Sequence, residues 1–151
     1  MIQLVFPDHK FRLRRWQGRE QVFDGIRKRW VALTPEEWVR QHFIQYLLQT
    51  KEYPAAMIAI EKKMMLGELT KRFDILVYDN RHKPWLMVEC KGADVVLNDD
   101  TLHQLLRYNI AIPVPFLVVT NGATSYFFER TTEGMKEVGE LPVWKAGERE
   151  V

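Results

Sequence analysis

The chain has 151 residues and a formal net charge of +2 at neutral pH, so it suits a single domain and its charge alone does not indicate a nucleic-acid partner. Its apolar fraction of 46% and charged fraction of 28% are those of an ordinary globular protein, and its five tryptophans argue against disorder. The single cysteine, Cys90, excludes an intrachain disulfide and no apolar run could cross a bilayer, so we expect a cytoplasmic protein without membrane attachment.

The N-terminal part of the chain predicts a β-hairpin. Residues 11–16 and 20–24 flank the turn sequence Gln17-Gly18, and residues 30–33 form a short extended stretch. This region is rich in basic side chains, namely Lys10, Arg12, Arg14, Arg15, Arg19, Arg27, Lys28 and Arg29. A surface that approaches phosphate and an ordinary solvated hairpin face are equally compatible with this pattern.

A helix is predicted to begin directly after the hairpin region. Thr34 can cap it, Pro35 fits the first helical position, and Glu37 can complete a capping box with Thr34. The helix should continue to about Gln49, before Pro54 breaks the pattern. Its apolar stripe consists of Val39, Phe43, Tyr46 and Leu47.

The rest of the chain predicts a mixed β-sheet flanked by helices, of the α/β class. Strands are predicted at residues 55–61, 72–78, 85–91, 116–120 and 125–129, and a second helix, capped by Asn98 or Asp99, extends to about Ile110. The residues around Gly67 are predicted as a polar connection, and residues 131–151 as an irregular acidic tail. We expect one domain over residues 1–151, with its core in residues 30–130.

The segment Glu89-Cys90-Lys91 places two charged side chains at the end of the most apolar predicted strand. Alternate side chains share one face of a strand, so Glu89 and Lys91 point the same way and Cys90 faces the other side, as a core residue would. Burying a carboxylate and an ammonium is costly unless a partner compensates them. A metal ion would compensate Glu89, and a phosphate would compensate Lys91.

Asp74 is the acid that can meet this pair. It lies in the preceding predicted strand, and the short turn between the two strands lets Asp74 and Glu89 converge on one cation. Two other acid-x-lysine triplets, Asp8-His9-Lys10 and Glu61-Lys62-Lys63, lack this apolar setting. The structural alternative is a cross-strand ion pair between Asp74 and Lys91, with Glu89 solvated at the sheet edge.

Each predicted helix adds a candidate pair. Glu36 and Arg40 fall within the apolar stripe of the first helix, either as an ion pair four residues apart or as a carboxylate and a guanidinium directed at the site; we favour a site role for Glu36. Gln104 and Tyr108 lie together on a flank of the second helix and could present an amide and a phenol to a phosphate. Taken alone, they are better explained as two ordinary surface residues.

Together these residues resemble the PD-(D/E)XK nuclease superfamily. Asp74 matches its first acidic motif, Glu89-Cys90-Lys91 its acid-x-lysine motif, and Gln104-Leu105-Leu106-Arg107-Tyr108 its QxxxY motif. The closest likeness is to the N-terminal nuclease domain of type I restriction enzyme R subunits, including short stand-alone relatives. It is carried by residues 34–41, 88–92 and 120–122, and it covers roughly residues 30–130.

The resemblance implies a restriction-endonuclease-like fold and hydrolysis of phosphodiester bonds in DNA that depends on Mg²⁺, with Mn²⁺ as a substitute. The implied catalytic residues are Asp74, Glu89, Lys91, Glu36, Gln104 and Tyr108. The implied metal ligands are Asp74, Glu89 and the backbone carbonyl of Cys90. Lys91 would orient or deprotonate the attacking water, or stabilise the developing negative charge.

Two departures qualify the likeness. Phe73 stands where a proline often precedes the first acid, and no Gly-rich phosphate loop followed by Lys-Ser/Thr is present, so we expect no helicase motor within the chain. The resemblance implies DNA as a partner and is compatible with a homodimer and with separate restriction or helicase subunits.

Two other functional classes remain open. One is a catalytically inactive nuclease-fold module that binds nucleic acid or a partner protein. The other is a globular domain of unrelated role whose acid-x-lysine segment is a salt bridge. A zinc site is not expected, because the four histidines are scattered and there is one cysteine.

Overall fold

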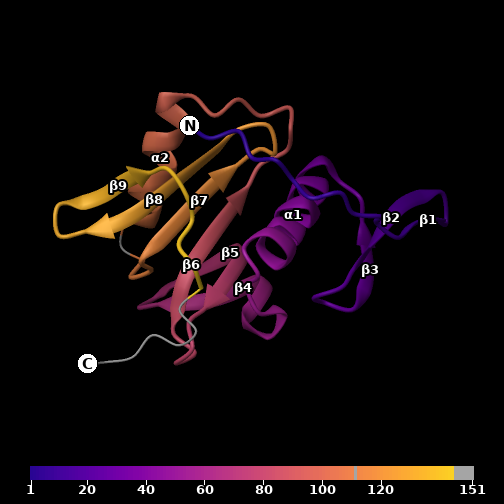
Figure 1. Cartoon of the computed structure of the whole chain (residues 1–151), viewed down its shortest axis with the longest axis horizontal. Coiled ribbons are helices and arrows are strands. Elements are labelled where there is room, and N and C mark those ends of the chain that lie inside the picture. Colours follow the sequence, from indigo (N-terminus) through magenta and orange to yellow (C-terminus); the bar gives the residue numbers. More distant parts are fainter. Residues whose placement is uncertain (111, 145–151) are drawn as a thin grey trace.

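The computed structural model describes residues 1–110 and 112–144, apart from the side chains of Leu66 and Tyr108. It contains two β-sheets, with helix α1 between them (Figure 1). The strands are β1 (Leu13–Trp16), β2 (Arg19–Asp24), β3 (Arg29–Ala32), β4 (Ile58–Leu66), β5 (Leu69–Tyr78), β6 (Pro84–Cys90), β7 (Phe116–Thr120), β8 (Ser125–Thr131) and β9 (Gly134–Val138). The α-helices are α1 (Pro35–Gln45) and α2 (Asp99–Asn109). The predicted α/β class is confirmed.

The N-terminal sheet is antiparallel, in the order β1-β2-β3, and it stands apart from the main sheet on the far side of α1 (Figure 1). Trp16 pairs with Arg19, so Gln17 and Gly18 form a two-residue turn. Both turn residues have positive φ, 50° and 76°, as in the turns whose twist suits a hairpin. The predicted hairpin is confirmed, and β3 adds a third strand where the sequence predicted a short extended stretch.

Helix α1 begins as predicted. The Thr34 side chain accepts a hydrogen bond from the Glu37 N–H at 3.0 Å. The α-helix ends at Gln45 and continues as a single π-helical turn, Tyr46–Thr50, followed by a short 3₁₀ turn, Ala55–Met57. The predicted apolar stripe, Val39, Phe43, Tyr46 and Leu47, is buried against one face of the main sheet.

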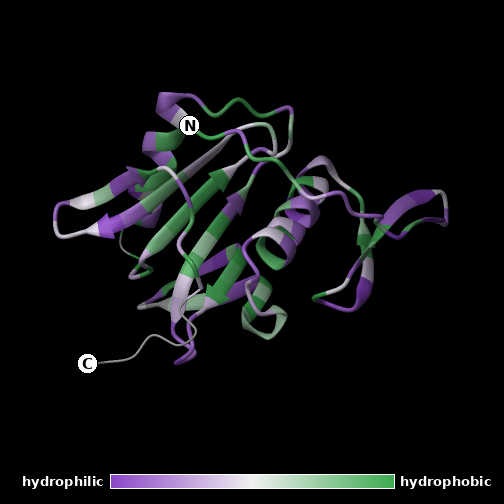
Figure 2. Cartoon of the chain, viewed as in Figure 1, coloured by the Kyte–Doolittle hydropathy of each residue, from purple (hydrophilic) through white to green (hydrophobic). Residues whose placement is uncertain are grey.

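The main sheet has the order β4-β5-β6-β7-β8-β9, in which β6 and β7 are parallel and the other neighbours are antiparallel. A parallel pair needs a crossover, and α2 lies on that crossover. Leu86 and Val88 of β6 pack in the cluster under α1, whereas Met87 packs in the cluster under α2. Because β6 is covered on both faces, its sequence is apolar from Pro84 to Val88 (Figure 2).

The predicted polar connection around Gly67 is wrong. Strand β4 begins at Ile58 and continues to Leu66, and β5 already begins at Leu69, so Gly67 (φ 64°) and Glu68 form a tight hairpin turn. The segment is polar because β4 is an edge strand, and its Lys62 and Lys63 are exposed.

The predicted irregular tail is also wrong in its first part. Strand β8 extends to Thr131, and β9 pairs antiparallel with it at the other edge of the sheet. An edge strand is held by main-chain hydrogen bonds while its side chains stay largely polar, so no strong apolar alternation marks it in the sequence. Residues 145–151 of the predicted tail lie outside the described part of the chain.

Within the described residues, neither α-helix is long and apolar enough to cross a bilayer.

Candidate active site

The main sheet forks where β5 and β6 stop pairing. Their pairing ends at Ile75 and Val88, although β5 extends further outward and β6 continues to Cys90. Beyond this point β5 remains paired with β4, and β6 with β7. The fork therefore opens directly beside Asp74 on β5 and Glu89 on β6.

Asp74 lies at the inner end of the fork. Its Oδ2 accepts a hydrogen bond from the main-chain N–H of Cys90 at 2.7 Å, which satisfies this donor at the point where the β5–β6 ladder ends. Its Oδ1 lies 3.7 Å from Nη1 of Arg40. Burial raises the pKa of Asp74, and the hydrogen bond from Cys90 and the charges of Arg40 and Lys91 offset this only in part.

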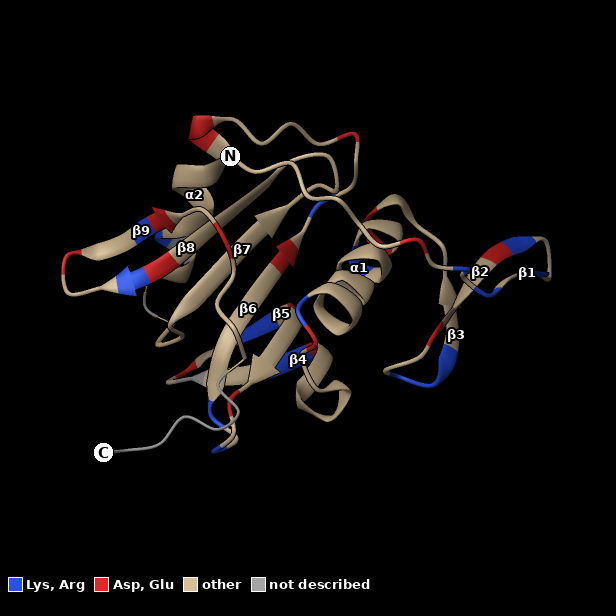
Figure 3. Cartoon of the chain, viewed as in Figure 1, with Lys and Arg blue, Asp and Glu red and all other residues tan. Residues whose placement is uncertain are grey.

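Glu89 lies across the fork from Asp74 and is 8% exposed (the red segment of β6 in Figure 3). Its Oε1 is 3.1 Å from Nζ of Lys71, which belongs to the outer part of β5. Burial raises the pKa of Glu89; the charge of Lys71 acts against this rise, and that of Asp74 adds to it. The structural alternative that left Glu89 solvated is therefore wrong.

Lys91 directly follows β6, and its main-chain N–H donates to the carbonyl of Thr120 at 2.8 Å. Its ammonium is close enough to lower the pKa of Glu36, Asp74 and Glu89. The strand thus places Lys91 among the same acids that the sequence pattern joined to it.

The first turn of α1 borders the fork. Gly92 allows this approach, because a Cβ at that position would lie 3.1 Å from the Cβ of Pro35. Burial raises the pKa of Glu36, Asp74 raises it further, and Lys91 lowers it. Glu36 therefore shares the electrostatic environment of the fork, as its predicted site role requires.

The alternative ion pair between Glu36 and Arg40 is wrong. Arg40 is buried and donates to the carboxylate of Glu37 at 2.8 Å and 3.0 Å. Glu37 is buried and Glu36 is exposed, so Glu37 is the better partner for a buried guanidinium. The predicted capping box is therefore formed only in part: Thr34 accepts from the Glu37 N–H, but the Glu37 carboxylate is held by Arg40, Arg27 and Gln41 instead of reaching back to Thr34.

The sequence pattern did not single out three charged residues near the fork, namely Arg27, Glu61 and Lys71. Arg40 also donates to Glu61 at 3.0 Å, and Arg27 lies 3.6 Å from the same carboxylate. Glu61 did not stand out because its acid-x-lysine triplet lacks an apolar strand. Lys71 did not stand out because the strand was predicted to begin after it. Only the coordinates mark Glu61, through its backbone φ of 53°, which is a strained conformation for a residue other than glycine.

Other predicted site residues have different outcomes. Gln104 is exposed on α2, and the described contacts do not join it to the fork. The side chain of Tyr108 lies outside the described part of the structure. Cys90 is 1% exposed within the core cluster under α1, as predicted for a core residue, and burial raises its pKa well above the usual value.

The fork fits a hard divalent cation in the chemistry of its donors. Among the described side chains, no group of three or more His, Cys, Asp and Glu residues is arranged to hold a metal ion. Asp74 and Glu89 would supply two carboxylate ligands, and main-chain and water oxygens would have to complete the shell, as Mg²⁺ commonly accepts. A buried acid, Glu89, and a partly buried one, Asp74, both have raised pKa values and lie near the cations of Arg40, Lys71 and Lys91, which marks this as a place that favours positive charge.

Comparison with protein families identifies one matching pattern, described as the type I restriction enzyme R protein N terminus, over residues 35–142. No curated protein matches the chain. The matched range contains the fork, α1 and α2, and it excludes the N-terminal sheet. Because the match spans more than half of the chain, the protein belongs to the family of type I restriction enzyme R protein N-terminal domains.

Proposed function

We propose that the protein is a Mg²⁺-dependent nuclease that hydrolyses phosphodiester bonds in DNA. The observation that carries the proposal is the fork, where Asp74 and Glu89 on two diverging strands are both shielded from solvent and have raised pKa values. Lys91 follows directly on the second strand. A nuclease-like role also follows from the family, whose description names a restriction enzyme.

The proposed roles follow from the donors at the fork. Mg²⁺, when bound, would supply neutralisation of phosphate charge and a more acidic water. Asp74, Glu89 and the main-chain carbonyl of Cys90 would hold it. Lys91 would orient the attacking water or stabilise negative charge that develops on the phosphate. Glu36 would bind water at the border of the fork. The motif resemblance, and not a described contact, assigns Gln104 and Tyr108 to positioning the phosphate.

The family also supports partners. DNA is the proposed substrate, and other subunits of a type I restriction system are proposed to associate with the chain. Pairing into a homodimer would let two forks cut both strands of a duplex. The proposed location of this activity is the cytoplasm.

The direct test is cleavage of linear, circular and single-stranded DNA by the purified protein, with Mg²⁺ and with EDTA. We expect cleavage only with Mg²⁺. Asp74→Ala and Lys91→Ala should keep the fold, as judged by circular dichroism, and lose cleavage, because one removes a metal ligand and the other removes the cation nearest the phosphate.

Two matched substitutions serve as controls. Asp8→Ala removes an acid from another acid-x-lysine triplet, and Lys83→Ala removes an exposed lysine before β6; both should cleave like the parent protein. Mg²⁺-dependent cleavage that survives in both Asp74→Ala and Lys91→Ala would show that the fork is not the catalytic centre.

A second candidate function has its own observation. Lys71 lies 3.1 Å from Glu89, and Asp74 already accepts from the Cys90 N–H and faces Arg40, so the chain's own groups partly compensate the two acids. This arrangement favours an inactive nuclease-fold module that binds nucleic acid or a protein. Calorimetric titration with Mg²⁺ or Mn²⁺ separates the two, since DNA binding without metal affinity, or with metal affinity that Asp74→Ala leaves intact, supports the inactive module.

A further inference from the structure

Residues 10–33 precede the range that matches the family, and their charge differs from that of the rest of the chain. They contain eight lysines and arginines and two acids, a net charge of +6, so the remaining sequence has a net charge of −4. Figure 3 shows basic segments on all three strands of the N-terminal sheet. The small overall charge therefore conceals a basic sheet attached to an acidic body.

One face of this sheet alternates guanidinium groups with aromatic rings. The Arg12 guanidinium lies 4.5 Å from the ring centre of Phe23, and that of Arg14 lies 4.4 Å from Trp30 and 4.9 Å from Trp16. We name Arg12, Arg14, Trp16, Arg19, Phe23 and Trp30 the arginine–aromatic face.

Strand pairing explains why these side chains share a face. Phe23 stands opposite Trp30, and Trp16 stands opposite Arg19, while alternate residues along β1 point the same way. Stacking fixes the plane of a guanidinium without removing its charge. The result is a row of oriented cations whose remaining N–H groups are available to an anion.

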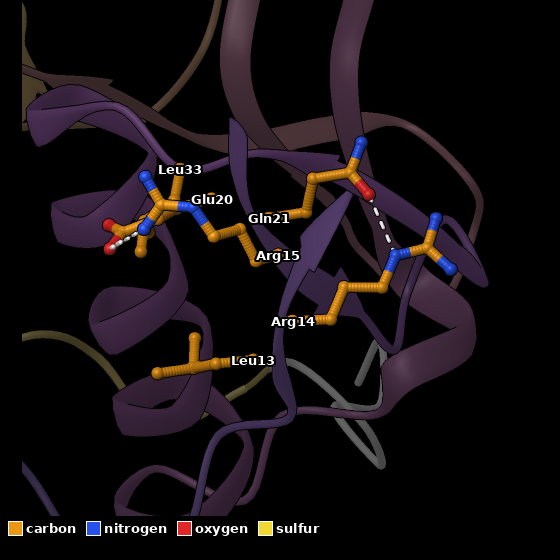
Figure 4. A pocket seen from close by; sticks show the side chains of 6 residues that line it. All are labelled: Leu13, Arg14, Arg15, Glu20, Gln21 and Leu33. Atoms are coloured by element: carbon orange, nitrogen blue, oxygen red, sulfur yellow. Dashed lines mark hydrogen bonds and ion pairs between the residues drawn. The ribbon is translucent and has the colours of Figure 1, made fainter. Parts of the chain in front are cut away.

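The opposite face of the sheet has a different character. Leu13, Arg15, Glu20 and Leu33 line a hollow of about 270 Å³, with Arg14 and Gln21 at its edge (Figure 4). Arg15 is 4.0 Å from Glu20, whereas Arg14 donates to Gln21 on the other side of the strand. Two neighbouring arginines of β1 thus lie on opposite faces, one beside an acid and one among aromatic rings.

The sheet is fixed to the body beside the fork. Arg27, in the connection between β2 and β3, is 2.7 Å from Asp24 and 2.8 Å from Glu37 of α1. Glu37 in turn holds Arg40, which faces Asp74. A chain of buried ion pairs therefore joins the base of the sheet to the end of α1 that borders the fork.

We propose that the arginine–aromatic face binds the phosphate backbone of the DNA substrate. This deepens the proposed function, because it names how a nuclease of this family would retain its substrate. Trp16 is 53% exposed, so its ring can also stack on an unpaired base. Duplex DNA would use the phosphate contacts, and single-stranded DNA would use these contacts and Trp16.

The test measures DNA affinity by fluorescence anisotropy with the full chain in EDTA, using labelled oligo(dT) and a labelled duplex of equal length over a salt series. The double variant Arg12→Gln/Arg14→Gln should bind both DNAs about tenfold more weakly, since each phosphate contact contributes several-fold. The slope of log affinity against log salt should fall by about 2, roughly one for each lost contact.

Two further variants make the test specific to the face. Arg15→Gln removes one arginine charge next to Arg14 but on the opposite face, and should bind like the parent protein. Trp16→Ala keeps every charge and should weaken oligo(dT) binding while leaving duplex binding unchanged. If the double variant melts at a lower temperature than the parent protein, the single variant Arg19→Gln, at an exposed residue of the same face, replaces it in the comparison with Arg15→Gln.

Parent-like DNA affinity and salt slope in the double variant would overturn the proposal, as would equal losses in the Arg15→Gln variant. Parent-like oligo(dT) binding by Trp16→Ala would overturn the role of its ring. Because all binding is measured without divalent metal, failure of the nuclease proposal leaves these results unaffected. A protein that binds DNA through this face but does not cleave it would contradict the proposed nuclease alone.

Discussion

The acids at the fork are side chains whose folded environment opposes their charge. Burial raises the pKa of Asp74, of Glu89 and of Glu36. Ionising each of them therefore requires more free energy in the folded chain than in the unfolded chain. A site that holds acids in this way binds a cation more tightly. Without the cation, the folded protein is less stable.

Asp74→Asn should therefore raise the melting temperature of the metal-free protein. Because the pKa of Asp74 is higher in the folded chain, the folded state binds the proton more tightly than the unfolded state does. The stability that this proton contributes is complete below the unfolded pKa of Asp74 and is lost as the pH rises through its folded pKa. At neutral pH the ionised Asp74 destabilises the folded parent protein to its full extent. Asn removes this charge and keeps an acceptor for the Cys90 N–H. The melting temperature should rise by roughly 2–4 °C for each kcal/mol of stability that Asn restores.

The measurement is thermal unfolding in EDTA and in Mg²⁺, at neutral pH and near pH 4. The stabilisation by Asn should shrink at the lower pH, and Mg²⁺ should stabilise the parent protein more than the variant. Asp8→Asn, at an exposed acid, is the matched control. A lower melting temperature for Asp74→Asn in EDTA would mean that Arg40 and the Cys90 N–H stabilise the charged form after all.

At the scale of elements, the joint between the N-terminal sheet and α1 is made of charges. Asp24 is fully buried, and its carboxylate accepts from Arg27 and Gln41. Burial would raise the pKa values of Asp24 and Glu37, but their hydrogen bonds outweigh it and lower both. Their contribution to stability is therefore present above the unfolded pKa values and is lost as pH falls through the lowered folded ones.

Arg27→Met should destabilise the protein by about 3–5 kcal/mol, because it leaves two buried carboxylates without their shared cation. Urea denaturation at neutral pH measures the loss. Below the pKa values of these acids the difference from the parent protein should narrow, since the protonated acids no longer need the cation.

The control for this joint is Arg15→Ala. Arg15 lies 4.0 Å from Glu20 in an exposed pair, so its removal should cost between about 0 and 1 kcal/mol. A similar cost for Arg27→Met and Arg15→Ala would show that the joint contributes no more than a surface ion pair.

At the scale of the whole molecule, β6 is one of the central strands that contribute side chains to both core clusters. Leu86 and Val88 pack with α1, and Met87 packs with the cluster that contains Leu102 of α2. The same strand carries Glu89 next to its last residue, so the core that stabilises the fold also fixes the position of the fork.

Leu86→Ala should destabilise the protein by about 2–5 kcal/mol, since the side chain is fully buried and its removal leaves a cavity. Urea transitions followed by tryptophan fluorescence and by far-ultraviolet circular dichroism should coincide if the sheet and both helices unfold together. Leu69→Ala, at a position that is 74% exposed, should change stability by no more than about 0.5 kcal/mol. Separate transitions in the parent protein would contradict one cooperative unit.

Local chemistry in the sequence was enough to predict the class of fold and the acids that meet at the candidate site. The cap at Thr34, the turn at Gln17-Gly18 and the apolar run before Glu89 each depend on near neighbours in the chain, and each is found as predicted. The family likeness rested on the same local patterns, and the family is confirmed.

Only the tertiary structure decided which charges meet. The partners of Glu89 and Arg40, namely Lys71, Glu37 and Glu61, depend on where two strands diverge and on which face of α1 is buried. The two edge strands, β4 and β9, were predicted too short or not at all, because main-chain pairing with a neighbour lets an edge strand keep polar side chains. A sequence shows the charges along the chain, whereas burial and strand pairing, which act between distant segments, determine the partner of each one.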